Sequence, residues 1–146
     1  MMARKIYAAL DTNVLVSARL KPNSVPARLV AYALGGAIIP VTNELIFAEY
    51  SEVLHRPKFK LPARVISDLL DALRSVSLTV SAGNASAIQA HTPDADDIVF
   101  YATALTSRAA GNTTYLVTGN LRHFPQEDFI VSPRAMLDII EQGNSR

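Results

Sequence analysis

Short apolar runs alternate with longer stretches of helical periodicity along most of the chain. The uninterrupted apolar run at 6–10 is typical of a strand that is buried on both faces of a sheet. Further strands are predicted at 37–41, 78–80, 114–117 and 129–131. Helical spacing, bounded by capping residues, proline and glycine, predicts helices between them, at 26–34, 43–54, 63–76, 94–110 and 134–141.

This order of elements favours a parallel sheet with helices on both faces, which is an α/β fold. A short additional helix is expected after the first strand, capped by Thr12 or Asn13. Pro40 indicates that the second strand is short or lies at an edge of the sheet, because proline cannot donate to the ladder. No repeat or linker interrupts the pattern. We therefore expect one domain over 1–142, followed by a frayed tail at 143–146.

Composition narrows the class of protein. The chain has 146 residues, of which 49% are hydrophobic and 18% charged, so it is long and apolar enough for one globular domain rather than a disordered protein. It has no cysteine, which excludes disulfides, thiolate zinc sites and a cysteine nucleophile. No segment is long enough to span a membrane, and the first apolar run breaks at Asp11, too early for a secretory signal. We expect a cytoplasmic protein without a membrane partner.

The formal net charge is only +1, but charge is unevenly distributed. Residues 1–30 carry five basic residues and one acid, and residues 55–64 carry four basic residues and no acid. Residues 86–101 carry three aspartates and no base. Basic patches beside an acidic cluster suit a metal-dependent enzyme that acts on a polyanion, although ordinary solvated faces produce the same kind of pattern.

Several polar residues are predicted to meet at one edge of the sheet. Asp11 directly follows the first strand, and the segment 118–120 directly follows the fourth. Asp94, Asp96 and Asp97 begin the helix between the third and fourth strands. Ligands of open parallel sheets bind outside the carboxyl ends of the strands. These residues are therefore candidates for a ligand site.

Glu49 adds a carboxylate from the helix at 43–54. Leu45 and Val53, four residues before and after it, place Glu49 within the apolar stripe of that helix. A carboxylate on an apolar face costs several kcal/mol unless it is paired or bound to a metal. Simpler roles are open: Glu49 could pair with Arg56, Asp11 could cap the first helix, and the other acids could be capping residues.

Carboxylates that converge in one cleft repel one another and stay ionised together only when a cation is present. Oxygen ligands favour Mg²⁺ or Mn²⁺ over zinc. Such ions activate water and stabilise charge on a phosphodiester, and basic segments nearby would hold the phosphate backbone. The residues therefore indicate hydrolysis of a nucleic acid.

Four segments carry these residues in order along the chain, at 11–17 (DTNVLVS), 49–59 (EYSEVLHRPKF), 96–104 (DDIVFYATA) and 117–125 (VTGNLRHFP). Together they resemble the motifs of PIN-domain nucleases, over about residues 5–140. The combination is similar to the branch described as toxin components of toxin–antitoxin systems, akin to VapC ribonucleases.

The resemblance implies a three-layer α/β/α sandwich with a central parallel sheet and a Mg²⁺- or Mn²⁺-dependent endoribonuclease. Carried over by position, it implies that the core metal-binding and catalytic carboxylates are Asp11, Glu49 and Asp97. Asp94 and Asp96 become auxiliary ligands, and Asn13 an auxiliary site residue.

Thr118 and Asn120 complete the set of catalytic residues that the resemblance implies. Thr118 would orient Asp11 or a water molecule. Many PIN domains have an aspartate where this chain has Asn120, so one charge is missing and a second metal site is weakened. Asn120 still offers a carbonyl oxygen.

The partners expected from the resemblance are an RNA substrate, a small antitoxin protein that occupies the cleft, and a second copy in a homodimer. Candidate contacts to the RNA backbone are Lys21, Arg56, Lys58 and Arg122.

Three alternatives stay open at this point. Asn120 favours a catalytically weakened PIN-like module that binds RNA or protein, and a DNA nuclease would use the same chemistry. A receiver-like signalling module also gathers acids at the strand ends. It would need an aspartate ending the third strand and a lysine ending the fifth, where this chain has Ser81 and Ser132.

Overall fold

A computed structural model describes residues 4–83 and 95–144 of the chain. The described strands form one five-stranded parallel sheet with the order β3-β2-β1-β4-β5. They are β1 (Tyr7–Leu10), β2 (Ile39–Thr42), β3 (Leu78–Thr79), β4 (Thr114–Val117) and β5 (Ile130–Val131). The central strand β1 lies in the core, because Ala8, Ala9 and Leu10 are almost completely inaccessible to solvent.

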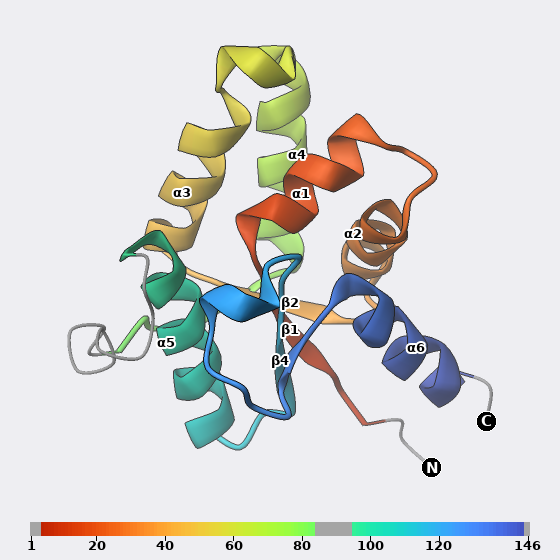
Figure 1. Cartoon of the computed structure of the whole chain (residues 1–146), viewed down its shortest axis with the longest axis vertical. Coiled ribbons are helices and arrows are strands. Elements are labelled where there is room, and N and C mark those ends of the chain that lie inside the picture. Colours follow the sequence, from red (N-terminus) through yellow and green to blue (C-terminus); the bar gives the residue numbers. More distant parts are fainter. Residues whose placement is uncertain (1–3, 84–94, 145–146) are drawn as a thin grey trace.

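Helices cover both faces of this sheet, which confirms the predicted fold class. They are α1 (Thr12–Leu20), α2 (Val25–Gly35), α3 (Glu44–Leu54), α4 (Ala63–Val76), α5 (Ala95–Ala109) and α6 (Pro133–Asn144). Figure 1 shows α5 on one side of the sheet and α2 and α6 on the other. Two short 3-10 turns, η1 (Pro57–Phe59) and η3 (Leu121–His123), lie in loops. None of the described helices is long and apolar enough to cross a membrane.

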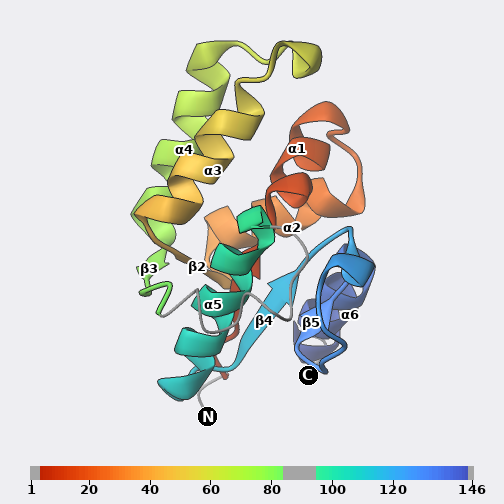
Figure 2. The same ribbon diagram turned by 60° about the vertical axis from the view of Figure 1, so that its left-hand side comes forward.

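Helices α1 and α3 begin where β1 and β2 end, so they rise from the carboxyl ends of the strands (Figure 1). Figure 2 shows α3 and α4 as an antiparallel pair that extends beyond the sheet on that side. Asn43 caps α3, because its side-chain oxygen accepts a hydrogen bond from Ile46 N at 3.0 Å. The elements that extend from the strands' carboxyl ends therefore surround the predicted site.

The prediction that Thr12 or Asn13 caps the first helix is wrong by one or two residues. Asp11 is the cap, with extended backbone angles and a side chain that accepts a hydrogen bond from Thr12 N at 2.8 Å. The strand ends at Leu10 and the helix begins directly after the cap, so Asp11 alone forms the junction. The simpler role considered for Asp11, as a helix cap, is thus present in the structure beside any role in a ligand site.

Pro40 does not place its strand at an edge. β2 is short, as expected, but it lies between β3 and β1. Ile39 N donates toward β1, to Ile6 O at 2.9 Å, so the nitrogen of the next residue faces the β3 side. Pairing with β3 begins only at Val41, opposite Leu78, so the proline interrupts no ladder bond.

The other sequence predictions about buried and terminal residues are mostly confirmed. α5 is deeply buried through its apolar middle section, which includes Phe100 and Ala104. Phe124 and Phe129 pack in the hydrophobic core. α6 is longer than expected and continues to Asn144, into the segment predicted to fray.

Candidate active site

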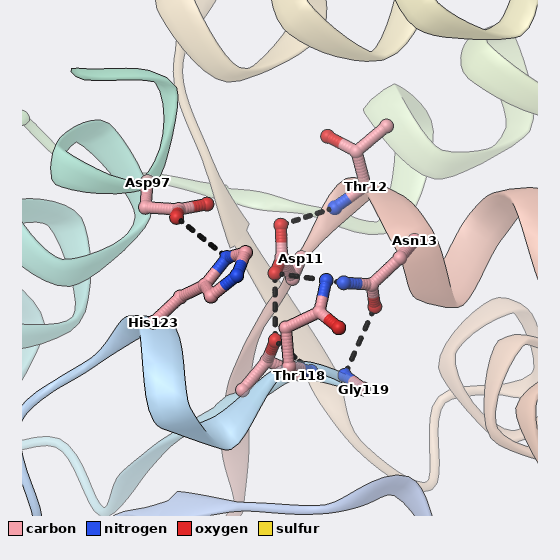
Figure 3. Close-up of polar contacts among 8 residues, drawn as sticks. Asp11, Thr12, Asn13, Asp97, Thr118, Gly119 and His123 are labelled. Carbon is pink, nitrogen blue, oxygen red and sulfur yellow. Dashed lines mark hydrogen bonds and ion pairs between the residues drawn. The ribbon is translucent and has the colours of Figure 1, made fainter. Parts of the chain in front are cut away.

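Asp11 lies at the carboxyl end of the central strand and is only 5% exposed. Three donors from two strand ends hold its carboxylate (Figure 3). Thr12 N donates to Oδ1 at 2.8 Å, while Asn13 Nδ2 and Thr118 Oγ1 donate to Oδ2 at 3.1 and 2.7 Å. Thr118 therefore orients Asp11 directly, as one of its two predicted roles requires.

The same side chains bind the loop after β4 to the start of α1. Asn13 Oδ1 accepts a hydrogen bond from Gly119 N at 3.0 Å, and Thr118 Oγ1 accepts one from Asn120 N at 3.0 Å. A Cβ atom at Gly119 would lie 3.3 Å from Asn13 Oδ1, which is tight. Besides bonding to Asp11, Asn13 accepts a hydrogen bond from the opposite loop and Thr118 accepts one from its own loop. Both donors to the carboxylate are therefore held in place themselves.

Burial is the dominant electrostatic influence on Asp11. Removal from water raises the pKa of the Asp11 carboxyl, and the hydrogen bonds from Thr118, Thr12 and Asn13 offset only part of that rise. The charge of His123 also acts to lower this pKa. A carboxylate with little water around it gains more from a bound cation than an exposed carboxylate does.

Asp97 is brought to the same place from the first turn of α5. Its side chain is 13% exposed, and its Oδ2 lies 3.4 Å from His123 Nδ1 in η3. Figure 3 shows the imidazole of His123 between the carboxylates of Asp97 and Asp11. His123 lies within the fourth motif segment, 117–125, but the sequence predicted no role for it. The one feature of the sequence that could have indicated a role in the site is the position of His123 shortly after β4.

Glu49 lies on α3, whose position is fixed near Asp11. Tyr50 OH donates to the carbonyl of Leu10 at 2.6 Å, and Leu10 precedes Asp11. The side chain of Glu49 is half-buried, but the predicted apolar stripe around it is partly wrong because Leu45 is 61% exposed. α3 packs instead through Ile46, Phe47, Tyr50 and Leu54. Glu49 therefore flanks the buried face rather than lying within it.

The comparison with protein families decides what kind of protein this is. The model of the PIN domain matches residues 7–122. The chain belongs to the PIN domain family. The match runs from β1 into η3 and therefore includes Asp11, Glu49, Asp97, Thr118 and Asn120. No curated protein matches the chain.

PIN domains have a nuclease-type fold and generally depend on a divalent metal ion, so the residues present can be tested against such an ion. The groups that surround Asp11 offer oxygen atoms, which suit a small hard cation. Thr12 Oγ1 is buried beside Asp11 and has no hydrogen-bond partner in the part of the chain that the structure describes. A desolvated carboxylate next to an unsatisfied hydroxyl fits a hydrated cation at Asp11.

A complete metal cage is not formed by the described side chains of this PIN domain. Within 4–83 and 95–144, no three acidic or histidine side chains are grouped closely enough to surround an ion. Asp94 and the side chain of Asp96 lie outside the described residues. The structure brings Asp11 and Asp97 to opposite sides of His123, and the convergence of Glu49 with them stays a prediction.

The basic residues predicted to contact RNA differ in whether a neighbouring carboxylate pairs with them. Lys21, Lys58 and Arg122 are exposed, after α1, in η1 and in η3 respectively. Arg56 is also exposed, but its guanidinium is paired with Glu52 at 2.9 Å. The neighbouring carboxylate reduces the positive charge that Arg56 offers to an anion.

Proposed function

We propose that this PIN domain is a Mg²⁺- or Mn²⁺-dependent endoribonuclease that hydrolyses phosphodiester bonds of single-stranded RNA. One observation carries the proposal: a buried carboxylate, Asp11, is held rigidly at the end of the central strand, beside the Asp97–His123 pair. A buried acid with a raised pKa in a family of nuclease-type fold is a strong candidate for a catalytic group. The choice of RNA rests on the resemblance of the four motifs to VapC-like ribonucleases.

In this proposal Asp11 and Asp97 hold the cation, with Glu49 joining them directly or through water. The bound ion would polarise a phosphate oxygen and activate a water molecule for attack. Thr118 and Asn13 keep the Asp11 carboxylate in one orientation through their bonds to Oδ2. Asn120 carries no charge where many PIN domains have an acid, so we propose one firm metal site rather than two.

The backbone of the RNA would be held by cationic groups around this site. Lys21, Lys58 and Arg122 are the candidates that no carboxylate neutralises in the described contacts, and Arg56 contributes more weakly. Neutralising phosphates releases counterions, so binding should weaken as salt concentration rises.

We further propose that the chain acts as the toxin of a toxin–antitoxin pair in the cytoplasm. A small antitoxin protein would occupy the cleft around Asp11, and two copies of the chain would form a homodimer. Support for these partners comes from the resemblance of the four motifs.

The proposal is tested by cleavage of matched single-stranded RNA and DNA with MnCl₂ or EDTA. The wild-type protein should cut RNA only with the metal, and Asp11→Asn should remove that activity while circular dichroism stays unchanged. Asp138→Asn, which makes the same charge change at an exposed position on α6, is the matched control and should keep full activity. Full activity in Asp11→Asn would refute the proposed role of Asp11.

A second candidate function is a catalytically weakened PIN domain that binds RNA, and Asn120 is the observation that favours it. In that case the wild-type protein would bind RNA and Mn²⁺ but cut neither nucleic acid. Preferential cleavage of DNA in the same assay would instead identify a DNA nuclease.

A further inference from the structure

Two buried threonine hydroxyls lack a hydrogen-bond partner among the described residues. They belong to Thr12, which is 6% exposed, and Thr42, which is 1% exposed. Each is close to the carboxyl end of a neighbouring strand, since Thr12 follows β1 by two residues and Thr42 ends β2. Buried polar groups are nearly always satisfied in native proteins, so each exception needs a physical explanation.

Thr12 cannot satisfy its hydroxyl in the way that helical threonines usually do. Within a helix the hydroxyl donates back to a carbonyl three or four residues earlier. Thr12 is the first residue of α1, so those earlier carbonyls belong to β1 and not to a preceding helical turn. Its backbone N–H is already bound to Asp11 Oδ1. The hydroxyl is thus left free at the boundary between strand and helix.

The surroundings of the two hydroxyls differ in charge. Thr12 adjoins Asp11, a carboxylate whose loss of water on burial is offset only in part by its hydrogen bonds. Figure 3 shows the hydroxyl of Thr12 turned away from Asp11 and to the side on which Asp97 lies. Thr42 ends β2 and is followed by the uncharged Asn43, whose amide donates to Val80 O and Thr103 Oγ1.

We propose that Thr12 Oγ1 positions a divalent cation held by Asp11, by accepting a hydrogen bond from a water molecule of the ion's hydration shell. This inference rests on the metal dependence in the proposed function. Mg²⁺ and Mn²⁺ in such sites keep several waters, and a hydroxyl oxygen has lone pairs to accept their hydrogens. One ligand would then satisfy two unfavourable groups at once, the desolvated carboxylate and the free hydroxyl. Thr12 acts through water and is a positioning residue.

The test is calorimetric titration of the full chain with MnCl₂ alone, together with thermal unfolding in EDTA. Thr12→Val removes the hydroxyl and keeps the side-chain shape, and it should weaken Mn²⁺ binding about tenfold or more, as loss of an outer-shell partner does. Thr12→Ser keeps the hydroxyl and should bind like wild type. Thr42→Val is the matched control, because it removes an equally buried hydroxyl from the end of the neighbouring strand β2, which is not adjacent to Asp11 in the chain, and it should leave Mn²⁺ binding unchanged.

In EDTA, both valine variants should unfold at a temperature about 3 °C higher than wild type, because each loses an unsatisfied buried group. A purely structural role for Thr12 cannot produce higher stability together with weaker Mn²⁺ binding. If Thr12→Val does not fold, Thr12→Ala makes the same comparison of Mn²⁺ affinity.

Equal Mn²⁺ affinity in Thr12→Val and wild type overturns this inference and leaves the proposed function intact. The inference also fails if Thr12→Ser binds as weakly as Thr12→Val, because the lost group would then be the methyl. A lower unfolding temperature of Thr12→Val in EDTA would show that the hydroxyl is satisfied within the protein. Wild-type protein that binds no Mn²⁺ overturns the inference together with the proposed metal dependence.

Discussion

Asp11 and Asp97 lie on either side of His123, yet the protein holds their carboxylates in different ways. Asp11 accepts three hydrogen bonds from groups at the ends of β1 and β4. Each of the two donor side chains also accepts a backbone hydrogen bond from the loop after β4. Asp97 is joined to His123 across 3.4 Å, and the imidazole is 42% exposed.

This difference shows that the fold preorganises the carboxylate of Asp11 more than that of Asp97. Asp11 can change orientation only if the junction of β1, α1 and the loop after β4 is disturbed, so it is preorganised. The Asp97–His123 contact is longer and more open to water, so it is weaker and can adjust when a ligand binds. The largest consequences of mutation should therefore fall on the Asp11 side.

The strongest test of this contrast is the stability of the metal-free protein. Asp11→Ala removes the cap of α1 and leaves buried donors unpaired, so the free energy of unfolding should fall by about 2–3 kcal/mol. Asp97→Ala breaks a partly exposed contact and should lower it by less than about 1 kcal/mol. Urea denaturation in EDTA measures both values. An equal or larger loss of unfolding free energy in Asp97→Ala would show that Asp11 is not held more firmly than Asp97.

Next in expected size is the effect of Thr118 on activity. Thr118→Val removes the 2.7 Å donor to Asp11 and the acceptor for Asn120 N, and RNA cleavage should fall about 10–100-fold. Thr118→Ser keeps the hydroxyl and should retain most of the activity. Steady-state cleavage rates of a fluorescent RNA under saturating MnCl₂ measure the effect. Unchanged rates in Thr118→Val would show that Asp11 does not depend on this bond.

His123 should matter less than Thr118 for the same reaction. His123→Gln keeps a hydrogen-bonding group near Asp97 but removes the ring, so cleavage should fall by less than about tenfold. The free energy of unfolding should change by no more than about 0.5 kcal/mol, because the imidazole is partly exposed. Measuring cleavage by both variants in the same assay shows whether Thr118 or His123 contributes more to activity. A larger loss in His123→Gln than in Thr118→Val would reverse the ranking.

The smallest effect concerns the loop that follows η3. Tyr101, on the helix that carries Asp97, donates to Glu127 Oε2 at 2.5 Å, and burial followed by this hydrogen bond and the nearby charge raises the pKa of Tyr101 to about 12. Its ordinary value is 10.0, so the stability that Tyr101 contributes is fully present below pH 10 and is lost as pH rises toward 12.

The unfolding temperature should therefore decline between pH 9 and pH 12. The decline should be shallower in Tyr101→Phe, because phenylalanine does not titrate. The wild-type and variant curves should run parallel below pH 10. Parallel curves over the whole range would show that the Tyr101–Glu127 bond does not link stability to pH.

Much of the fold was predictable because local patterns agreed with the tertiary structure. The helix at 63–76 has the predicted bounds, and the helix predicted at 94–110 is present as Ala95–Ala109. Asp11 and Thr118 were placed at the same edge by the rule that parallel strands end together. Their contact in the structure confirms that placement.

The errors occurred where pairing or packing between distant segments decides the outcome. Pro40 is internal because its nitrogen faces a stretch where β3 has not yet begun, and β3 is almost forty residues away in sequence. Leu45 is exposed because α3 packs through a neighbouring stripe. Nothing in the local sequence around His123 indicated that its imidazole would reach Asp97.

By itself the sequence determined the order of elements, the parallel sheet and the segments that end at its carboxyl edge, because these follow from local periodicity and chain direction. The tertiary structure alone decided how the side chains at that edge pair. It placed His123 between two carboxylates, bound Asn13 to Gly119 and left the hydroxyl of Thr12 without a hydrogen-bond partner within 4–83 and 95–144. The physical reason is that hydrogen-bond distances of about 3 Å between residues a hundred positions apart depend on the packing of the whole sheet.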